Sequence, residues 1–321
     1  MNPRPAVTLV GPQDGNWLSF NGIPVQILAH GTQTNGTYTL SRGAVPPDCG
    51  APPHVHSFDE GFYIVRGELT FTAGHRVITA RAGAFINIRG GTAHATRNAT
   101  NSDVEVVVIA APAGFDGFQQ AVGEPAPGPD GPFAPAPADI RERMQQASAA
   151  FDINMQPAAA LFEAEPTITF RQPGEGERFA CVGDVYTFLA TSEHTGGRYA
   201  IWHALVYPGG GPPPHVHTRE EEAFFILRGE LAAYDHDQRV GAGPGSLIVL
   251  PKNSLHRFKN ETEEPVEMLI LIAPGGGEEM FRQFGRPWPT LDRPPLPDRE
   301  EIARLIALAP DFGVELHLPA H

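Results

Sequence analysis

Histidine and glutamate side chains that suit metal binding recur in two matching groups along the 321-residue sequence. The segment PPHVHSFDEGFYIVRGEL, residues 52–69, places His54 and His56 one residue apart and Glu60 four residues further on. Residues i and i+2 of an extended strand project from the same face, so the two imidazoles are expected to point together. A converging imidazole pair beside a carboxylate is typical of a chelating site for a divalent cation.

The same pattern returns in PPHVHTREEEAFFILRGEL, residues 213–231, and a third histidine follows each glutamate by 34 residues, at His94 and His256. A single His-x-His pair on a strand is more often solvated or hydrogen-bonded within the protein than bound to a metal. Loop residues drift between diverged copies, whereas these four ligand-type side chains keep their register in both. The repeated pattern therefore favours metal binding in at least one copy.

The repeat extends over almost the whole chain. The offset between the copies is 161 residues up to the paired histidines, and it becomes 162 after one inserted residue, so that Pro53 matches Pro214 and Gly67 matches Gly229. A period near 160 residues indicates a duplicated domain rather than a solenoid of short repeats. We predict two domains, residues 1–155 and 156–321.

Each copy consists of short strand-like segments separated by turn signals about every ten residues. No helical pattern lies between adjacent strands, which favours an antiparallel sandwich or barrel over a parallel sheet. Helix is predicted only after each sheet, near 138–151 and 298–309, with Asp139 and Asp298 as N-caps. The strands predicted in the first copy are 25–29, 38–45, 62–65, 68–73, 76–80, 84–88, 94–98 and 105–110.

These segments resemble the two cupin motifs, G-x5-H-x-H-x3,4-E-x6-G and G-x5-P-x-G-x2-H-x3-N. The second motif is matched in both copies, except that Arg89 replaces its proline in one and Asn253 replaces its glycine in the other. The glycine that opens the first motif is displaced, to Gly50 and Gly211. The residues that match the second motif are Gly83, Gly91, His94 and Asn98, and then Gly245, Pro251, His256 and Asn260.

The resemblance implies an all-β bicupin, with two tandem cupin jelly-roll β-barrels that are each followed by a short C-terminal helix and each hold one metal ion. Asp59, Glu220 and Glu221 stand beside the ligand glutamates. The spacing to the following glycine selects Glu60 and Glu222 instead, and the other three are expected to be solvated acids. The implied metal ligands are His54, His56, Glu60 and His94, and then His215, His217, Glu222 and His256.

Three imidazole nitrogens and one carboxylate oxygen, without a thiolate, suit a borderline-to-hard divalent ion, so Mn, Fe, Ni, Co and Cu all remain open. Four protein ligands leave coordination positions free, as a catalytic site requires. Apolar residues share strand parity with the glutamates or lie beside the third histidines. Singly they read as core, but together they predict a pocket for an aromatic ligand. They are Phe62, Ile64, Thr96, Phe224, Ile226 and Phe258.

Among bicupins with this ligand set, the chain resembles the quercetin 2,3-dioxygenases. The likeness implies a metal-dependent dioxygenase that binds a flavonol-like enolic aromatic substrate and O2, with Glu60 and Glu222 as candidate catalytic bases. It also implies a homodimer. Two alternatives stay open: a lyase that resembles the manganese oxalate decarboxylases, and a non-catalytic ligand-binding bicupin.

The charge balance argues against nucleic acid or an anionic membrane as a partner. The net charge is −14, and only two of the 23 basic residues are lysines. Cys49 and Cys181 are too far apart in sequence for a zinc-ligand spacing, and a disulfide framework is not expected. The opening MNPRPAVTLVG has no apolar segment behind basic residues, so we expect no secretion signal and a cytoplasmic location.

Overall fold

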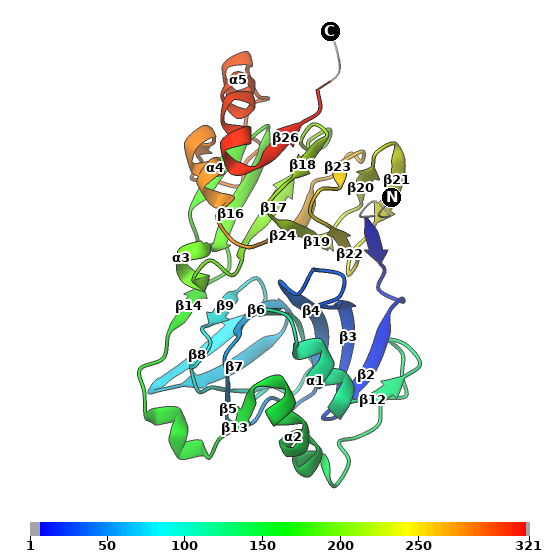
Figure 1. Ribbon diagram of the computed structural model, residues 1–321, viewed down its shortest axis with the longest axis vertical. Helices are drawn as coiled ribbons and strands as arrows, with labels where there is room; N and C mark the ends of the chain where they lie inside the picture. The colour runs from blue at the N-terminus through cyan, green and yellow to red at the C-terminus, as the bar shows by residue number, and fades with distance from the viewer. Residues whose placement is uncertain (1–6, 319–321) are drawn as a thin grey trace. The chain divides into compact units, whose positions relative to one another are not determined.

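The computed structural model describes residues 7–318 (Figure 1). The chain divides into two compact units. The N-terminal unit is Gln13–Gly174, and the C-terminal unit combines residues 7–12 with residues 175–318. The domain boundaries predicted from the repeat, 1–155 and 156–321, stay a prediction.

The N-terminal unit is built from antiparallel sheets. Its main sheet has the strand order β12-β2-β3-β4-β11-β6-β9-β14, a second sheet has the order β10-β7-β8, and β5 pairs with β13. The main-sheet strands are β2 (Asn16–Phe20), β3 (Ile23–Ala29), β4 (Thr39–Val45), β6 (Asp59–Arg66), β9 (Phe85–Ile88), β11 (Val104–Ala111), β12 (Glu124–Ala126) and β14 (Ile168–Arg171). The others are β5 (His54–His56), β7 (Glu68–Ala73), β8 (Arg76–Arg81), β10 (Ala95–Arg97) and β13 (Ile153–Met155).

The C-terminal unit repeats this plan, with the strand orders β1-β22-β19-β24-β17-β16-β15-β25 and β21-β20-β23-β18-β26. The first sheet contains β1 (Thr8–Val10), β15 (Arg178–Cys181), β16 (Asp184–Ala190), β17 (Ala200–Val206), β19 (Glu221–Arg228), β22 (Leu247–Leu250), β24 (Val266–Ala273) and β25 (Arg286–Pro287). The second contains β18 (His215–His217), β20 (Leu231–Asp235), β21 (Gln238–Ala242), β23 (Leu255–Lys259) and β26 (Val314–Leu316).

Burial along the strands follows the sequence pattern. In β7 the buried residues alternate with half-buried ones, as expected for a strand with one face on the core. The apolar runs of β11 and β24 lie between two neighbouring strands in the middle of their sheets and are almost entirely buried. The predicted all-β, jelly-roll architecture is confirmed, although the sheets are not closed into complete barrels.

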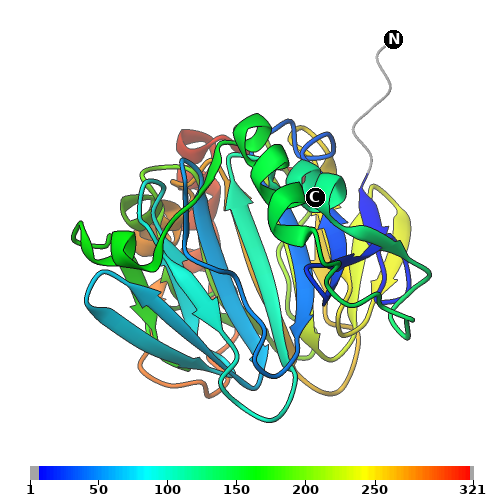
Figure 2. The same cartoon turned by 90° about the horizontal axis from the view of Figure 1, so that it is seen from below.

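Helices are more numerous than predicted. The predicted helices are present as α2 (Ile140–Ser148) and α5 (Arg299–Leu308), but α1 (Phe115–Val122), α3 (Ser192–Thr195) and α4 (Glu278–Phe284) were not expected. In the N-terminal unit, α1 and α2 lie side by side at one end of the sheet (Figure 2). The described residues contain no helix with the length and apolar character needed to cross a membrane.

One predicted helix cap is correct and the other is not. The Asp298 carboxylate accepts the backbone N–H of Glu301 at 2.8 Å, as an N-cap should. Asp139 precedes α2 but makes no capping hydrogen bond with its side chain. Short 3₁₀ helices follow both α2 and α5, and another precedes β14, at η1 (Ala149–Phe151), η3 (Ala309–Phe312) and η2 (Ala158–Phe162).

In each unit, one edge strand of the main sheet comes from a segment outside that unit's own repeat. This segment precedes the repeat that forms the other unit. β1 lies ahead of the first repeat in sequence, yet it pairs with β22 of the C-terminal unit, where Leu9 opposes Ile248. β14 lies between the repeats and pairs with β9 of the N-terminal unit. Because β9 and β22 are equivalent in the two copies, the two units are completed in the same way.

Candidate metal centres

Strand pairing gathers each predicted ligand group at one place. In the N-terminal unit, His54 and His94 exchange backbone hydrogen bonds of 3.0 and 2.9 Å, which sets β5 directly beside the loop that carries the third histidine. In the C-terminal unit, His215 opposes His256 in the pairing of β18 with β23. Within each group of four residues, the ligand atoms lie within 4.8 Å of one another. Residues 7–318 therefore contain two groups suited to binding a metal ion, one in each unit.

Backbone carbonyls orient the imidazoles of the N-terminal group. The Nδ1–H groups of His54, His56 and His94 donate to the carbonyl oxygens of Pro52 (2.8 Å), Phe58 (2.8 Å) and Thr92 (2.9 Å), respectively. A neutral imidazole that donates through Nδ1 carries its lone pair on Nε2. The three Nε2 atoms are thus available as ligands on the side away from the carbonyls.

The arrangement around Glu60 fits a cation. Its Oε2 lies 3.1 Å from Nε2 of both His56 and His94. If those imidazoles are neutral and donate through Nδ1, nitrogen lone pairs face a carboxylate oxygen, which is repulsive unless a positive charge lies among them. A divalent ion supplies that charge, and all of these atoms are ordinary ligand atoms for the metals considered above.

The pKa values of this buried group favour the forms that bind metals. Burial, together with the neighbouring His94, lowers the pKa of His54 to about 3, so His54 is neutral near pH 7. Burial alone raises the pKa of Glu60, but the close contacts with His56 and His94 outweigh that effect and hold it below its ordinary value. A neutral imidazole and an ionised carboxylate are the states that coordinate a cation.

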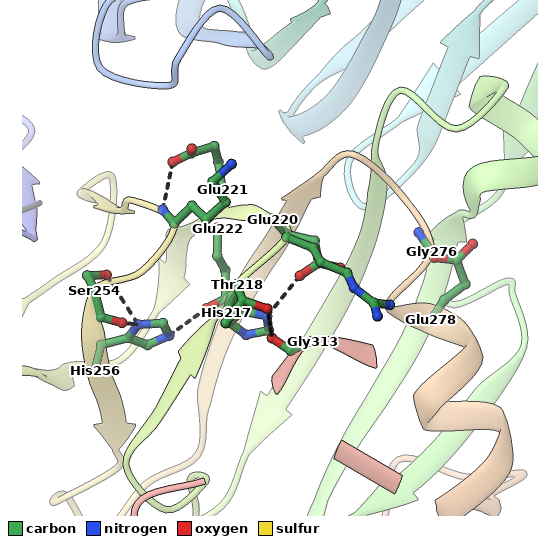
Figure 3. A network of polar contacts seen from close by, with 12 residues as sticks. His217, Thr218, Glu220, Glu221, Glu222, Ser254, His256, Gly276, Glu278 and Gly313 are labelled. Atoms are coloured by element: carbon green, nitrogen blue, oxygen red, sulfur yellow. Dashed lines mark hydrogen bonds and ion pairs between the residues drawn. The ribbon is translucent and has the colours of Figure 1, made fainter. Parts of the chain in front are cut away.

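In the C-terminal group, two of the three histidines again donate to backbone carbonyls, and the third has a different partner. The Nδ1–H groups of His215 and His256 donate to the carbonyl oxygens of Pro213 (3.0 Å) and Ser254 (3.1 Å). His217 instead donates to a carboxylate, Oε2 of Glu220, at 3.4 Å (Figure 3).

The ligand glutamate of the C-terminal group again faces histidine nitrogens. Oε2 of Glu222 lies 3.0 Å from Nε2 of His256 and 3.7 Å from Nε2 of His217. Burial, together with His256 and His217, holds the pKa of His215 well below its usual range. Burial lowers the pKa of His217, but Glu222 and Glu220 outweigh it and the net shift is upward.

The acids beside the ligand glutamates are not solvated, so that prediction was wrong. The Asp59 carboxylate accepts the backbone N–H of Gly90 at 2.9 Å, and Glu221 accepts that of Lys252 at the same distance. Both acids are buried, as is Glu220. Asp59 and Glu221 each fix the loop that leads to the third histidine, and Arg89, which replaces the motif proline, lies 3.1 Å from Asp59.

The motif asparagines stand four residues after the third histidine of each group and anchor the chain there through hydrogen bonds. Nδ2 of Asn98 donates to the carbonyl oxygens of Val45 and Ser102, both at 2.8 Å. Asn260 donates in the same way to Val206 (2.9 Å) and Glu264 (2.8 Å). Each asparagine is fully buried, so these bonds satisfy a polar group that would otherwise be costly to bury.

The glycine assignment for the first motif needs a correction. Gly209 stands six residues before His215, at the motif position, with a φ of +82°, and Asp48 holds the equivalent place with a φ of +63°. Gly50 and Gly211 are needed for a different reason. A Cβ atom there would lie 2.1 Å from the carbonyl oxygen of Thr96 or 2.2 Å from that of Phe258.

An apolar cavity of about 80 Å³ adjoins the C-terminal ligand group. Histidine and glutamate ligands form one part of its wall, and apolar side chains from α4, α5 and the neighbouring strands form most of the rest. Sequence reasoning missed most of these residues, because it searched only the strands next to the ligands. The wall includes His215, His217, Glu220, Glu222, Trp202, Phe258, Met280, Phe281 and Leu305.

The six residues predicted to form a substrate pocket have different places. Phe258 lines the cavity at the C-terminal group. Phe62 and Ile64 lie in the hydrophobic core of the N-terminal unit, and Phe224 and Ile226 lie in that of the C-terminal unit. Oγ1 of Thr96 accepts the backbone N–H of Ala51 at 2.9 Å. Their role as a pocket stays a prediction.

Comparison with known proteins agrees with this geometry. The cupin domain model matches the chain twice, at residues 41–110 and 202–272. The chain is 23% identical to quercetin 2,3-dioxygenase of Bacillus subtilis over 287 residues, which cover 86% of this chain and 85% of that protein.

Solved structures share the fold at low sequence identity. Oxalate decarboxylase of Lactobacillus farciminis, solved as a formate complex, matches with a TM-score of 0.57 and 12% identity, over 85% of this chain and 90% of that one. Procruciferin, an 11S globulin of Brassica napus, matches with a TM-score of 0.56 and 12% identity, over 85% of each chain. The chain thus has a cupin domain match in each of its two units, and it resembles quercetin 2,3-dioxygenase over most of its length.

Proposed function

We propose that the protein is a metal-dependent dioxygenase that cleaves an enolic aromatic, flavonol-like substrate with O2, and that each ligand group holds one divalent transition-metal ion. The ligands would be the four residues of each group described above. The observation that carries the proposal is the apolar cavity that opens directly onto Glu222, His215 and His217 of the C-terminal group. The likeness to a quercetin 2,3-dioxygenase supports the same reaction class.

A bound divalent transition metal would supply Lewis-acid polarisation of a substrate oxygen and would hold the reactants together. The chain's own residues do the rest. The Glu222 carboxylate accepts the proton of the substrate enol, which leaves an electron-rich enolate for reaction with dioxygen. Both oxygen atoms of O2 enter the ring-cleaved product. Trp202, Phe258 and Phe281 hold the aromatic ring and exclude water from the enolate.

The cavity wall argues for an aromatic substrate over a small dianion. The titratable side chains that line it are those of His215, His217, Glu220, Glu222, Cys181 and Tyr186, and the remaining wall is mostly apolar. A carboxylate such as Glu220 repels an oxalate dianion rather than binding it. The oxalate decarboxylases among the similar structures show the fold and do not change this inference.

The proposal is tested by incubating the protein with quercetin after loading with Mn, Fe, Ni, Co or Cu, in air and under argon. We expect the flavonol absorption band to disappear in an oxygen-dependent way with at least one metal. With the Glu222→Gln variant, the band should persist. Absence of oxygen-dependent turnover with all five metals would refute the dioxygenase function. Release of carbon dioxide from oxalate would support the decarboxylase alternative instead, and protein without bound metal would support a ligand-binding bicupin.

A further inference from the structure

The two ligand groups differ in what lies behind their second histidine. Phe58 and Glu220 occupy equivalent places, because each directly precedes the acid that accepts a backbone N–H of the loop before the third histidine, Asp59 or Glu221. The C-terminal copy reaches this place with one inserted residue. The two units therefore differ by an exchange of an aromatic ring for a carboxylate beside otherwise similar groups.

In the N-terminal unit, Phe58 fills the space next to the ligands. Its ring stacks on the imidazole of His56, with 3.7 Å between the ring centroids and 2° between the ring planes. Phe58 is only 6% exposed. Behind it lies an apolar cluster that includes Phe115, at 5.8 Å between ring centroids, and Phe118 and Ile153. One face of a ligand imidazole is thus covered by a ring that is itself held in place by the core.

In the C-terminal unit, the corresponding space is open. Glu220 contacts His217 at the Nδ1 atom and does not cover the ring as Phe58 covers His56. The apolar cavity extends from this histidine to the side chains of Met280 and Phe281 on α4. A ligand in the cavity therefore has direct access to the C-terminal group.

We propose that only the C-terminal group takes the organic substrate, and that Phe58 closes the N-terminal group to it. The substrate class is an enolic or catecholic aromatic, so the inference rests on the proposed function. The N-terminal group keeps all four of its ligands and holds its cation without turning substrate over. Phe58 is the residue that separates the two roles.

The test is an anaerobic titration of protein loaded with two equivalents of Co²⁺, with 4-nitrocatechol as the probe. The absorption of this aromatic enediol changes when its oxygens bind a metal, and without O2 nothing is turned over. We expect one equivalent of probe per chain in the unaltered protein, none in His217→Ala, two in Phe58→Ala and one in the double variant. Phe151→Ala is the matched control, because Phe151 belongs to the same apolar cluster and packs on Phe118. It should bind one equivalent.

Several results would overturn the inference: zero or two equivalents in the unaltered protein, one equivalent retained by His217→Ala, or one equivalent in a folded Phe58→Ala protein that holds two cobalt ions. If Phe58→Ala does not fold, Phe58→Leu removes the stacked ring with less loss of apolar volume, and the His217→Ala result decides by itself. Probe binding at the C-terminal group without any oxygen-dependent loss of quercetin would refute the dioxygenase function and leave this inference intact.

Discussion

The groups behind the histidines of the two candidate metal sites orient each imidazole and would set how strongly it donates to a bound metal. Five of the six ligand histidines donate Nδ1–H to a backbone carbonyl, and only His217 donates to a carboxylate, Glu220. A carboxylate behind a histidine makes the imidazole a more basic ligand than a carbonyl does. The C-terminal group is therefore expected to bind its metal through one unusually basic nitrogen.

Replacing Glu220 with glutamine should weaken metal binding at the C-terminal group alone. The amide has the same shape but no charge, and loss of such an outer partner typically costs about 10- to 100-fold in metal affinity or activity. We expect the dissociation constant of one metal equivalent to rise about tenfold, as measured by competition with a chromophoric chelator. The N-terminal group is the internal control, since the Nδ1 atoms of its histidines contact backbone carbonyls instead of a carboxylate. Equal weakening of both equivalents, or of neither, would contradict this explanation.

A second buried acid, Asp184, makes the free energy of unfolding depend on pH. Asp184 is fully buried at the start of β16, where its Oδ1 accepts the backbone N–H of Tyr207 at 2.9 Å. Burial raises its pKa to about 7, although the N–H groups of Tyr207 and Gly211 act in the opposite direction. The folded protein therefore keeps this proton at pH values at which the unfolded chain has lost it.

The free energy of unfolding should fall as the pH rises from about 4 to about 7, because the unfolded chain releases the Asp184 proton near 3.8 and the folded protein releases it only near 7. This contribution is fully present below the lower value and is lost through the upper one. Its size is up to about 4 kcal/mol, at 1.36 kcal/mol per pKa unit. Asp184→Asn should flatten the dependence, as measured by urea unfolding at several pH values with a chelator present. An unchanged pH slope in the variant would rule out Asp184 as its source.

At the scale of elements, the strands with their own periodic pattern were predictable and the others were not. All eight strands predicted in the first copy are present within a few residues, because alternation and turn residues mark them locally. β1 and β14 have three or four residues and pair with a sheet far away in sequence, so nothing local marks them. The segments of α1 and α4 are too short to show a helical period, and α4 supplies Met280 and Phe281 to the cavity.

The grouping of the candidate ligands was predictable for a related reason, and their surroundings were not. His54 and His56 lie on one strand, where spacing alone fixes their common face, and the repeat supplied the remaining ligands. The partners of Asp59 and Glu221 are N–H groups of loops 31 residues further along the chain, and a loop conformation cannot be read from such spacing. Likewise, the effect of having Phe58 in one copy and Glu220 in the other depends on contacts with His56 and His217 that form only in the folded units.

The edge strand β1, which precedes the first repeat but pairs with the C-terminal unit, leads to a prediction at the same scale. β1 pairs with β22, and β22 pairs with the strand that carries Glu222. Changing Thr8–Val10 to three glycines should lower the stability of the C-terminal unit by about 2 kcal/mol, because each glycine costs roughly 0.5–1 kcal/mol relative to alanine in a strand. Three threonines at the same positions are the control and should change little.

The readout for β1 is urea unfolding combined with hydrogen exchange of β19 and β22. The glycine variant should exchange faster in these two strands, while β6 and β9 of the N-terminal unit keep their protection. Equal destabilisation by glycine and threonine would show that the side chains of Leu9 and Val10 matter more than the strand they form. Unchanged exchange in β22 would show that β1 contributes little to the unit.

At the scale of the whole molecule, each unit contains a complete ligand group of its own. A cation that binds the folded unit and not the unfolded chain stabilises that unit by mass action, by about 2.7 kcal/mol at a free concentration 100 times the dissociation constant. Because the four ligands of each group come from a single unit, the stabilisation should be separable between the two. The same reasoning makes the metal a folding ligand for the N-terminal unit, whether or not substrate reaches it.

Metal should therefore slow hydrogen exchange in both units of the unaltered protein, relative to protein treated with a chelator. In Glu60→Gln the metal effect should vanish around β5 and β6 and persist around β18 and β19, and in Glu222→Gln the pattern should reverse. Each variant should also hold one metal equivalent instead of two, because an amide is a poor substitute for a carboxylate ligand. The variants serve as controls for each other. Loss of the metal effect in both units after a single substitution would show that the two groups bind cooperatively, contrary to the independence that their separate ligand sets imply.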